Sequence, residues 1–129
     1  MTKEQKELLL TDLCARLPYK VKVQDTYYNE LEPAPIWLLD LNAQAVRLFA
    51  DEGYQNIEYV KPYLFPLSSM TEWQERELEI LMKNSIESCG MLYPYDCLEM
   101  ERFFNENHID WRGLIPMGLA IDATGKNIY

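Results

Sequence analysis

Cysteine and histidine are the residue types best suited to nucleophilic catalysis, and this chain holds three cysteines and one histidine. Cys97 and His108 are eleven residues apart, so on a continuous helix they share a face but lie about 16 Å apart along its axis. A nucleophile needs its base within hydrogen-bond reach, so these two cannot form a dyad. Cys14 and Cys89 fall on apolar stripes of predicted helices, which is typical of buried, unreactive thiols.

The other residues that could take part in catalysis or binding are scattered along the chain. His108 follows a predicted helix, and we expect it to act as a cation at that helix C-terminus. Gly113 and Gly118 have the spacing of a phosphate-binding loop, but Leu119 and Ala120 stand where that chemistry needs Lys and Ser or Thr. One histidine and dispersed cysteines do not match a structural zinc site. The sequence therefore predicts no catalytic, cofactor-binding or metal-binding residue and favours a protein that is not an enzyme.

A predicted helix over residues 71–89 gathers acidic side chains in its first turns: Glu72, Glu75, Glu77 and Glu79. Such a cluster could indicate a metal site or a pair of catalytic carboxylates. The spacings Glu72–Arg76 and Glu79–Lys83 favour instead a solvated helix face that carries its own ion pairs, because side chains four residues apart are neighbours on a helix.

The same helix carries the candidate contact patch. With Leu78 at the centre of the apolar stripe, Trp73 and Ile80 fall about 220° and 200° round the helix, on the side opposite the core. Exposed tryptophan is frequent at binding hot spots. The alternative is that Trp73, in the first turn, folds back over residues 63–65.

Length and composition point to a single globular domain over residues 1–129. The chain is 48% hydrophobic and 12% aromatic, which is too rich in core-forming residues for a disordered protein. No apolar run approaches the roughly 18 residues of a membrane span, and the first residues lack the apolar stretch of a secretory signal. We therefore expect a cytoplasmic protein with reduced thiols and no membrane association.

The charge distribution limits the partners. The chain has 12 basic and 21 acidic residues, a net charge of −9, and residues 23–60 hold seven acidic residues and one basic residue. A protein that binds duplex phosphates needs a dense set of Lys and Arg side chains. The sequence thus predicts no direct nucleic-acid binding, and an acidic surface selects basic partners.

Hydrophobic periodicity predicts an α+β fold in which about four short strands form a small antiparallel sheet and three helices pack against it. Thr2 and Gln5 form a capping box before a helix that buries Leu10, Leu13, Cys14 and Leu17 and ends at Pro18. Strands are expected from residue 20 to residue 24, in a hairpin of 36–41 with 45–50, and over 56–60, ending before Lys61 and Pro62.

The second half of the chain is predicted to be helical and then irregular. Thr71 and Gln74 form a second capping box, and Asp96 caps a shorter helix that ends near Asn107. The segment 111–121 is apolar but contains Pro116 and two glycines, which prevent a helix. We expect this segment to be buried against the helices at 71–89 and 97–107.

Three blocks of the sequence, at residues 12–18, 60–72 and 111–120, resemble small uncharacterised proteins encoded by phages, prophages and mobile elements of Bacteroides-type gut bacteria. The family has no assigned activity, so the resemblance implies a genetic setting and no catalytic residue.

The resulting hypothesis is a non-enzymatic accessory or interaction protein of a phage or mobile element that acts through a protein partner. Two alternatives stay open. One is an enzyme whose site is assembled from distant residues such as Cys97, His108, Asp110 and Arg112. The other is an acidic DNA-mimic inhibitor, which requires carboxylates spaced like phosphates on one surface.

Overall fold

The computed structural model confirms the α+β class. It describes residues 1–28, 31–48, 53–89 and 94–129, with residues 83–89 and 94–96 described as backbone only. The described residues form three α-helices and two small sheets. The helices are α1 (Lys3–Arg16), α2 (Glu72–Cys89) and α3 (Pro94–Glu106). The strands are β1 (Lys22–Asp25), β2 (Ala34–Pro35), β3 (Leu38–Asp40), β4 (Ala45–Arg47), β5 (Gln55–Asn56), β6 (Val60–Pro66), β7 (Ile109–Asp110) and β8 (Ile121–Asp122). Short 3-10 turns follow α1 and flank β6, at Leu17–Tyr19, Ile57–Tyr59 and Leu67–Ser69.

Helix α1 begins and ends where its local signals predict, but it buries a different face. The Thr2 hydroxyl accepts from the Gln5 amide at 3.1 Å, and the Gln5 side chain accepts from the Thr2 amide at 3.0 Å. The buried residues of the helix are Leu9, Leu10, Asp12, Leu13 and Arg16. Cys14 and Leu17 are exposed, so their predicted burial is wrong. The buried face is rotated because it includes a charged pair, Asp12 and Arg16, which periodicity of apolar residues does not register.

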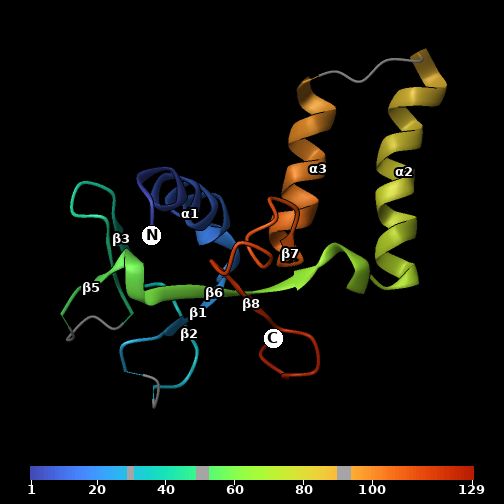
Figure 1. Ribbon diagram of the computed structural model, residues 1–129. Coiled ribbons are helices and arrows are strands. Elements are labelled where there is room, and N and C mark those ends of the chain that lie inside the picture. Colours follow the sequence, from blue (N-terminus) through green and yellow to red (C-terminus); the bar gives the residue numbers. More distant parts are fainter. Residues whose placement is uncertain (29–30, 49–52, 90–93) are drawn as a thin grey trace.

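The larger sheet is built round β6, which crosses the molecule in Figure 1. Its order is β2-β1-β6-β7, and β8 also pairs with β6. The pairs β2–β1 and β1–β6 are antiparallel, whereas β7 and β8 run parallel to β6. The predicted antiparallel pairing is present, but the two parallel pairs were not predicted. A parallel neighbour comes from a distant part of the chain, so local periodicity does not reveal it.

The predicted strand over 56–60 is also wrong. Residues 57–59 form a 3-10 turn, and the strand begins at Val60 and continues through Pro62 to Pro66. Proline lacks the amide donor that a ladder uses and is normally found where a strand is unpaired. The first residue of β6 to pair with β8 is Tyr63, and β7 joins at Phe65. Pro62 therefore lies where β6 has a neighbour, β1, on one side only.

The smaller sheet confirms the predicted hairpin. Strands β3 and β4 pair antiparallel with Asp40 opposite Ala45, and β5 pairs with β4. The turn is closed by the Asp40 carboxylate, which accepts from the Ala43 amide at 2.9 Å. Gln44 adopts a positive φ of 51° in this turn.

The main core lies between α1 and the sheets, and the described part of the α2–α3 hairpin contributes no side chain to it. The core cluster comes from α1, β1, β4, β6 and their connections, and from the C-terminal segment: Leu9, Leu10, Leu13, Val21, Val23, Val46, Leu48, Ile57, Val60, Leu64, Leu114, Leu119 and Ala120. Helix α2 packs on α3, and α3 contacts α1 and β7. In Figure 1 the hairpin projects from one end of the molecule. The three helices thus do not all cover the sheet, contrary to prediction.

Two features of the hairpin can be compared with expectation. The capping box of α2 is confirmed, because the Thr71 hydroxyl accepts from the Gln74 amide at 3.1 Å and the Gln74 side chain accepts from the Thr71 amide at 3.0 Å. Helix α3 begins at Pro94, two residues before Asp96. The prediction that Asp96 caps this helix is wrong, since proline at the first position of a helix is equally favourable.

The segment 111–121 is only partly buried: Leu114 and Leu119 are buried as predicted, whereas Trp111 and Ile115 are half-buried and residues 116–118 are exposed. Its partners also differ from those expected. Leu114 and Leu119 belong to the core cluster with α1 and the sheets. The Trp111 ring reaches α3, where it stacks on Phe104 at 6.2 Å between ring centres. The Asp110 carboxylate accepts from the Leu114 and Ile115 amides, both at 2.8 Å. These bonds hold the backbone in a turn in which Leu114 enters the core and Ile115 packs against it.

No helix among the described residues is both long enough and apolar enough to cross a membrane.

Candidate functional site

The two residues of the predicted contact patch are exposed on α2. Trp73 is 69% exposed and Ile80 is 57% exposed. Trp73 therefore does not fold back under cover of residues 63–65. A tryptophan this exposed leaves most of its apolar ring in water, which is unfavourable by about 25 cal/mol for each Å² of apolar surface.

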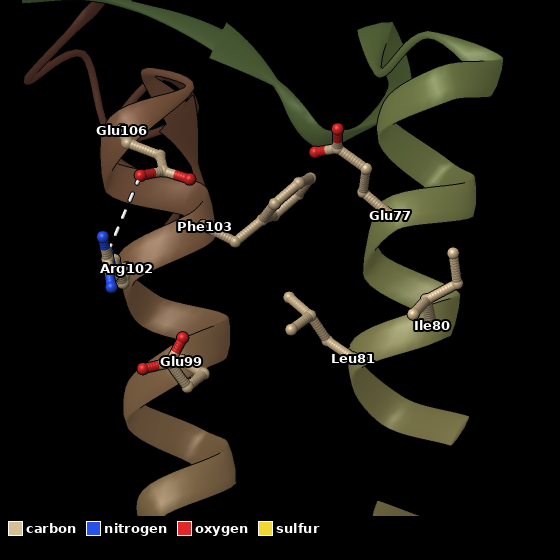
Figure 2. Close-up of a pocket in the computed structure, with 7 residues that line it drawn as sticks. All are labelled: Glu77, Ile80, Leu81, Glu99, Arg102, Phe103 and Glu106. Atoms are coloured by element: carbon tan, nitrogen blue, oxygen red, sulfur yellow. Dashed lines mark ion pairs between the residues drawn. The ribbon is translucent and has the colours of Figure 1, made fainter. Parts of the chain in front are cut away.

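Ile80 also lines a groove between α2 and α3, which we name the α2–α3 groove (Figure 2). The cavity has a volume of about 270 Å³. Its lining residues are Glu77, Ile80 and Leu81 from α2 and Glu99, Arg102, Phe103 and Glu106 from α3. In Figure 2 the Phe103 ring points from α3 towards α2, and Leu81 points back towards α3. These two side chains form the apolar floor.

Helical spacing explains why these residues share one surface. On α2, Trp73, Glu77 and Ile80 are separated by four and three residues and so lie along one face. On α3 the lining residues follow the same spacing, from Glu99 to Glu106. The exposed Trp73 lies about one turn before Glu77 on this face of α2, outside the described lining of the groove.

The rim of the groove is acidic. Arg102 is the one basic residue among the described lining residues, and its Nε lies 3.8 Å from a Glu106 carboxylate oxygen. Both side chains are largely exposed, so this pair contributes little to stability. Glu77 and Glu99 make no ion pair among the described residues. The groove thus carries negative charge on both helices.

Glu72, Glu75 and Glu79 at the start of α2 are exposed, as predicted, but the predicted Glu72–Arg76 ion pair is not formed. Glu72 and Arg76 are exposed, and the ion pairs of the described residues do not include them. The Glu79–Lys83 prediction lies outside the described side chains. Exposed i,i+4 pairs contribute only a few tenths of a kcal/mol, which is too little to fix two long side chains in one geometry.

The residues of the alternative enzyme site are not brought together. Helix α3 is continuous from Pro94 to Glu106, so Cys97 and His108 stay apart as their spacing predicts. Cys97 is exposed, whereas the His108 ring stacks on Tyr129 with 3.7 Å between ring centres and a 10° interplanar angle. A cavity near the end of β6 is lined by Asp110 and Arg112, but Cys97 and His108 are not among its described lining residues.

His108 does not act as a cation at the end of α3. It adopts a positive φ of 58° after the helix, and its Nδ1 is buried without a hydrogen-bond partner among the described residues. Burial, together with the charges of Arg16 and Lys22, lowers the pKa of His108 from 6.5 to about 4. The imidazole is therefore neutral at pH 7, and the predicted role is wrong because the site is both apolar and close to two cations.

Sequence reasoning missed a buried network of charges that joins the two ends of the chain. Asp12 and Arg16 are fully buried, and Arg16 Nε donates to the Asp12 carboxylate at 2.9 Å. Arg112 Nη1 donates to the other oxygen of Asp12 at 2.7 Å, and Arg16 Nη2 donates to the Ile109 carbonyl at 2.6 Å. The i,i+4 spacing of Asp12 and Arg16 is the only local signal, and it usually marks an exposed pair.

Arg16, Arg112 and Asp110 hold the fold together through hydrogen bonds. The α2–α3 groove is therefore the candidate site for a protein partner. Its floor is apolar, its rim is acidic and its neighbour Trp73 is exposed. The chain matches no family model, no curated protein and no solved structure.

Proposed function

We propose that this chain is a non-enzymatic interaction protein, an accessory protein of a phage or mobile element, which binds a protein partner in the α2–α3 groove. The observation that carries the proposal is the combination of an apolar floor with an acidic rim on an outlying helical hairpin. The partner is a basic amphipathic helix.

The groove has the features of helix-in-groove recognition, in which an amphipathic helix lays its apolar face between two others. Ile80 and the half-buried Leu81 supply the surface for apolar side chains, with the buried Phe103 ring beneath them. Trp73 is suited to be the anchor, because tryptophan is the residue type most enriched among binding hot spots. Lysine or arginine side chains flanking the apolar face of the partner would reach Glu77 and Glu99.

Electrostatics favours a basic partner over an acidic or neutral one. Among the described lining residues, Glu77, Glu99 and Glu106 outnumber Arg102, and the whole chain has a net charge of −9. A basic partner is steered towards such a surface, and an acidic partner is repelled.

Fluorescence anisotropy with two labelled model peptides tests this proposal. Both peptides are amphipathic helices with the same leucine face, one with lysine and the other with glutamate on the polar face. We expect the lysine peptide to bind and to weaken as salt rises, because the rim charges are screened. Equal binding of the two peptides, or binding of neither, would overturn the proposal.

Trp73→Ala and Trp37→Ala form a matched pair of variants. Both residues are exposed tryptophans, but Trp37 lies beside the smaller sheet, away from the α2–α3 hairpin. Trp73→Ala should weaken binding of the lysine peptide by at least about tenfold, the effect of losing a hot-spot side chain. Trp37→Ala should leave it unchanged; an equal loss in the two variants would show that the peptide does not dock in the groove.

A further inference from the structure

A second cavity lies at the other end of the molecule, next to the smaller sheet. It has a volume of about 440 Å³ and is lined by Asp25, Tyr28, Leu31, Gly53, Tyr54 and Gln55. We name it the Tyr28–Tyr54 cavity. It is bounded by the end of β1 and by the start of β5, which Figure 1 places far from α2.

A buried carboxylate lines this cavity. Asp25 is only 5% exposed. Its Oδ1 accepts from the Tyr27 and Tyr28 amides at 2.9 and 3.1 Å, and its Oδ2 accepts from the Gln55 side-chain amide at 3.1 Å. These donors are neutral, and no ion pair of the described residues includes Asp25. The hydrogen bonds fix the carboxylate in place but leave its charge uncompensated, which favours a cation in the cavity.

The walls of the cavity are aromatic. Tyr28 and Tyr54 are both about half exposed, and the Tyr28 ring is held edge-to-face by Tyr27 at 4.8 Å between ring centres. Tyrosine faces attract cations through their negative π-surface. The protein itself uses this attraction next to the cavity, where the Arg47 guanidinium lies 4.5 Å from the centre of the Tyr54 ring.

The local charge selects among ligands of suitable size. Asp25 is the one charged residue in the described lining, and Arg47 lies outside that lining, on the Tyr54 ring. An anion is therefore repelled by the lining, and a neutral molecule gains nothing from its charge. An organic cation gains from both the Asp25 carboxylate and the tyrosine faces. We propose that the Tyr28–Tyr54 cavity binds an ammonium or quaternary ammonium head group.

Titration with three probes, followed by NMR chemical shifts of the full chain, tests the chemistry of the ligand. Choline carries the charged head group, and 3,3-dimethylbutan-1-ol is its neutral isostere. We expect choline to bind at least about tenfold more tightly than the isostere, because only the charged head group makes a cation–π contact. Equal affinity for the two, or tighter binding of methyl glucoside as a neutral polyol, would overturn the proposal.

One more probe distinguishes the two possible sources of the head group, a free small molecule and a modified protein side chain. Acetyl-trimethyllysine amide presents the same charge on a protein side chain, whereas choline is a free small molecule. Binding of either supports the cation site, and their ratio tells which source the cavity prefers. Binding of neither would overturn it.

Asp25→Asn and Asp40→Asn form the matched pair of variants. Both remove one negative charge and keep the shape of the side chain, but Asp40 caps the β3–β4 turn and does not line the cavity. Asp25→Asn should weaken choline binding at least about tenfold, and Asp40→Asn should change it less than about twofold. If circular dichroism shows Asp25→Asn to be unfolded, Tyr28→Ala takes its place with the same expected loss.

This site and the α2–α3 groove can fail separately. Trp73→Ala should leave choline binding unchanged, and Asp25→Asn should leave binding of the lysine peptide unchanged. Equal choline affinity in Asp25→Asn and Asp40→Asn would overturn the cation site without bearing on the groove.

Discussion

The Arg16 guanidinium is fully buried, and its positive charge is balanced by the Asp12 carboxylate. The carboxylate of Asp12 is shared between Arg16 and Arg112, at 2.9 and 2.7 Å. Removal of the shared acid would leave two close guanidinium groups without a counter-charge, whereas removal of Arg16 would leave Asp12 still paired with Arg112. The three residues are therefore unequal in importance, and Asp12 is the central one.

We predict that Asp12→Asn lowers the free energy of unfolding by about 3–5 kcal/mol, the cost of breaking a buried ion pair from one side. Glu106→Gln is the matched control, because it removes the same charge from an exposed pair with Arg102 and should cost about 0–1 kcal/mol. Urea denaturation of both variants measures the difference. Similar midpoints for the two would contradict the burial of the Asp12–Arg16 pair.

His108 makes stability depend on pH in a defined direction. Burial lowers the pKa of His108 to about 4 in the folded chain, whereas the unfolded chain has the ordinary value of 6.5. Between pH 4 and pH 6.5, His108 is therefore protonated to a greater extent in the unfolded chain than in the folded chain. Stability from this group is therefore complete above about pH 6.5 and is lost as the pH falls towards 4.

Thermal melts of the unmodified chain and of His108→Asn check this prediction. Asparagine tolerates the positive φ of position 108 better than most residues, so the variant changes the titration with little backbone strain. The melting temperature of the unmodified chain should fall more steeply between pH 7 and pH 4.5 than that of the variant. Parallel pH profiles would show that His108 is not neutral in the folded state.

At the scale of elements, the α2–α3 hairpin is separate from the core that stabilises the rest. The core cluster holds residues from α1 and the sheets, and none from the described part of the hairpin. Regions with fewer buried contacts open locally at lower free energy. A hairpin that opens easily can adjust its groove to an incoming helix.

We predict faster amide hydrogen exchange in residues 76–82 of α2 than in residues 7–13 of α1. Thr71→Ala should raise the exchange rate of α2 further, because it removes the hydroxyl that accepts from the Gln74 amide and a lost N-cap costs about 1 kcal/mol. The rates in α1 should not change. Equal protection of the two helices would show that the hairpin unfolds with the core.

Features fixed by neighbouring residues could be predicted from the sequence. The capping boxes at Thr2 and Thr71 and the hairpin of β3 and β4 depend on contacts a few residues apart. The outward direction of Trp73 and Ile80 followed from helical geometry alone.

Features that depend on distant pairing could not be predicted. Asp12 is buried because Arg112, 100 residues later, reaches it. The α3 side of the groove depends on how α3 packs on α2, and the Tyr28–Tyr54 cavity on how β5 approaches the end of β1. In each case the partner is chosen by the tertiary fold, and no periodicity in either segment identifies it.

At the scale of the whole molecule, the C-terminal segment completes the core. Leu114 and Leu119 are buried with α1 and the sheets, β8 pairs with β6, and the Tyr129 hydroxyl donates to the Tyr63 carbonyl at 2.8 Å. Burial of each large aliphatic side chain contributes about 1.5–3 kcal/mol, against a total stability of about 5–15 kcal/mol for an ordinary domain.

We predict that truncation after Ile109 unfolds the domain. The truncated chain lacks both core leucines, the β8 strand and Arg112, which pairs with the buried Asp12. Circular dichroism should show loss of the cooperative melt. A melt within a few degrees of the full-length chain would show that the segment is dispensable for folding.

The parallel pairing of β6 has a consequence for synthesis of the chain. On the ribosome, α1, β1 and β6 emerge long before β7 and β8, which lie beside β6 in the finished sheet. A nascent chain exposed only as far as α3 has no Ile109 carbonyl for Arg16 and no Arg112 for Asp12. The charged face of α1 and the unpaired edge of β6 must remain solvated until β8, and Ala123 whose amide donates to the Leu64 carbonyl, have emerged. Synthesis from the N-terminus therefore delays closure of the core, because β8 leaves the exit tunnel after all the other described strands.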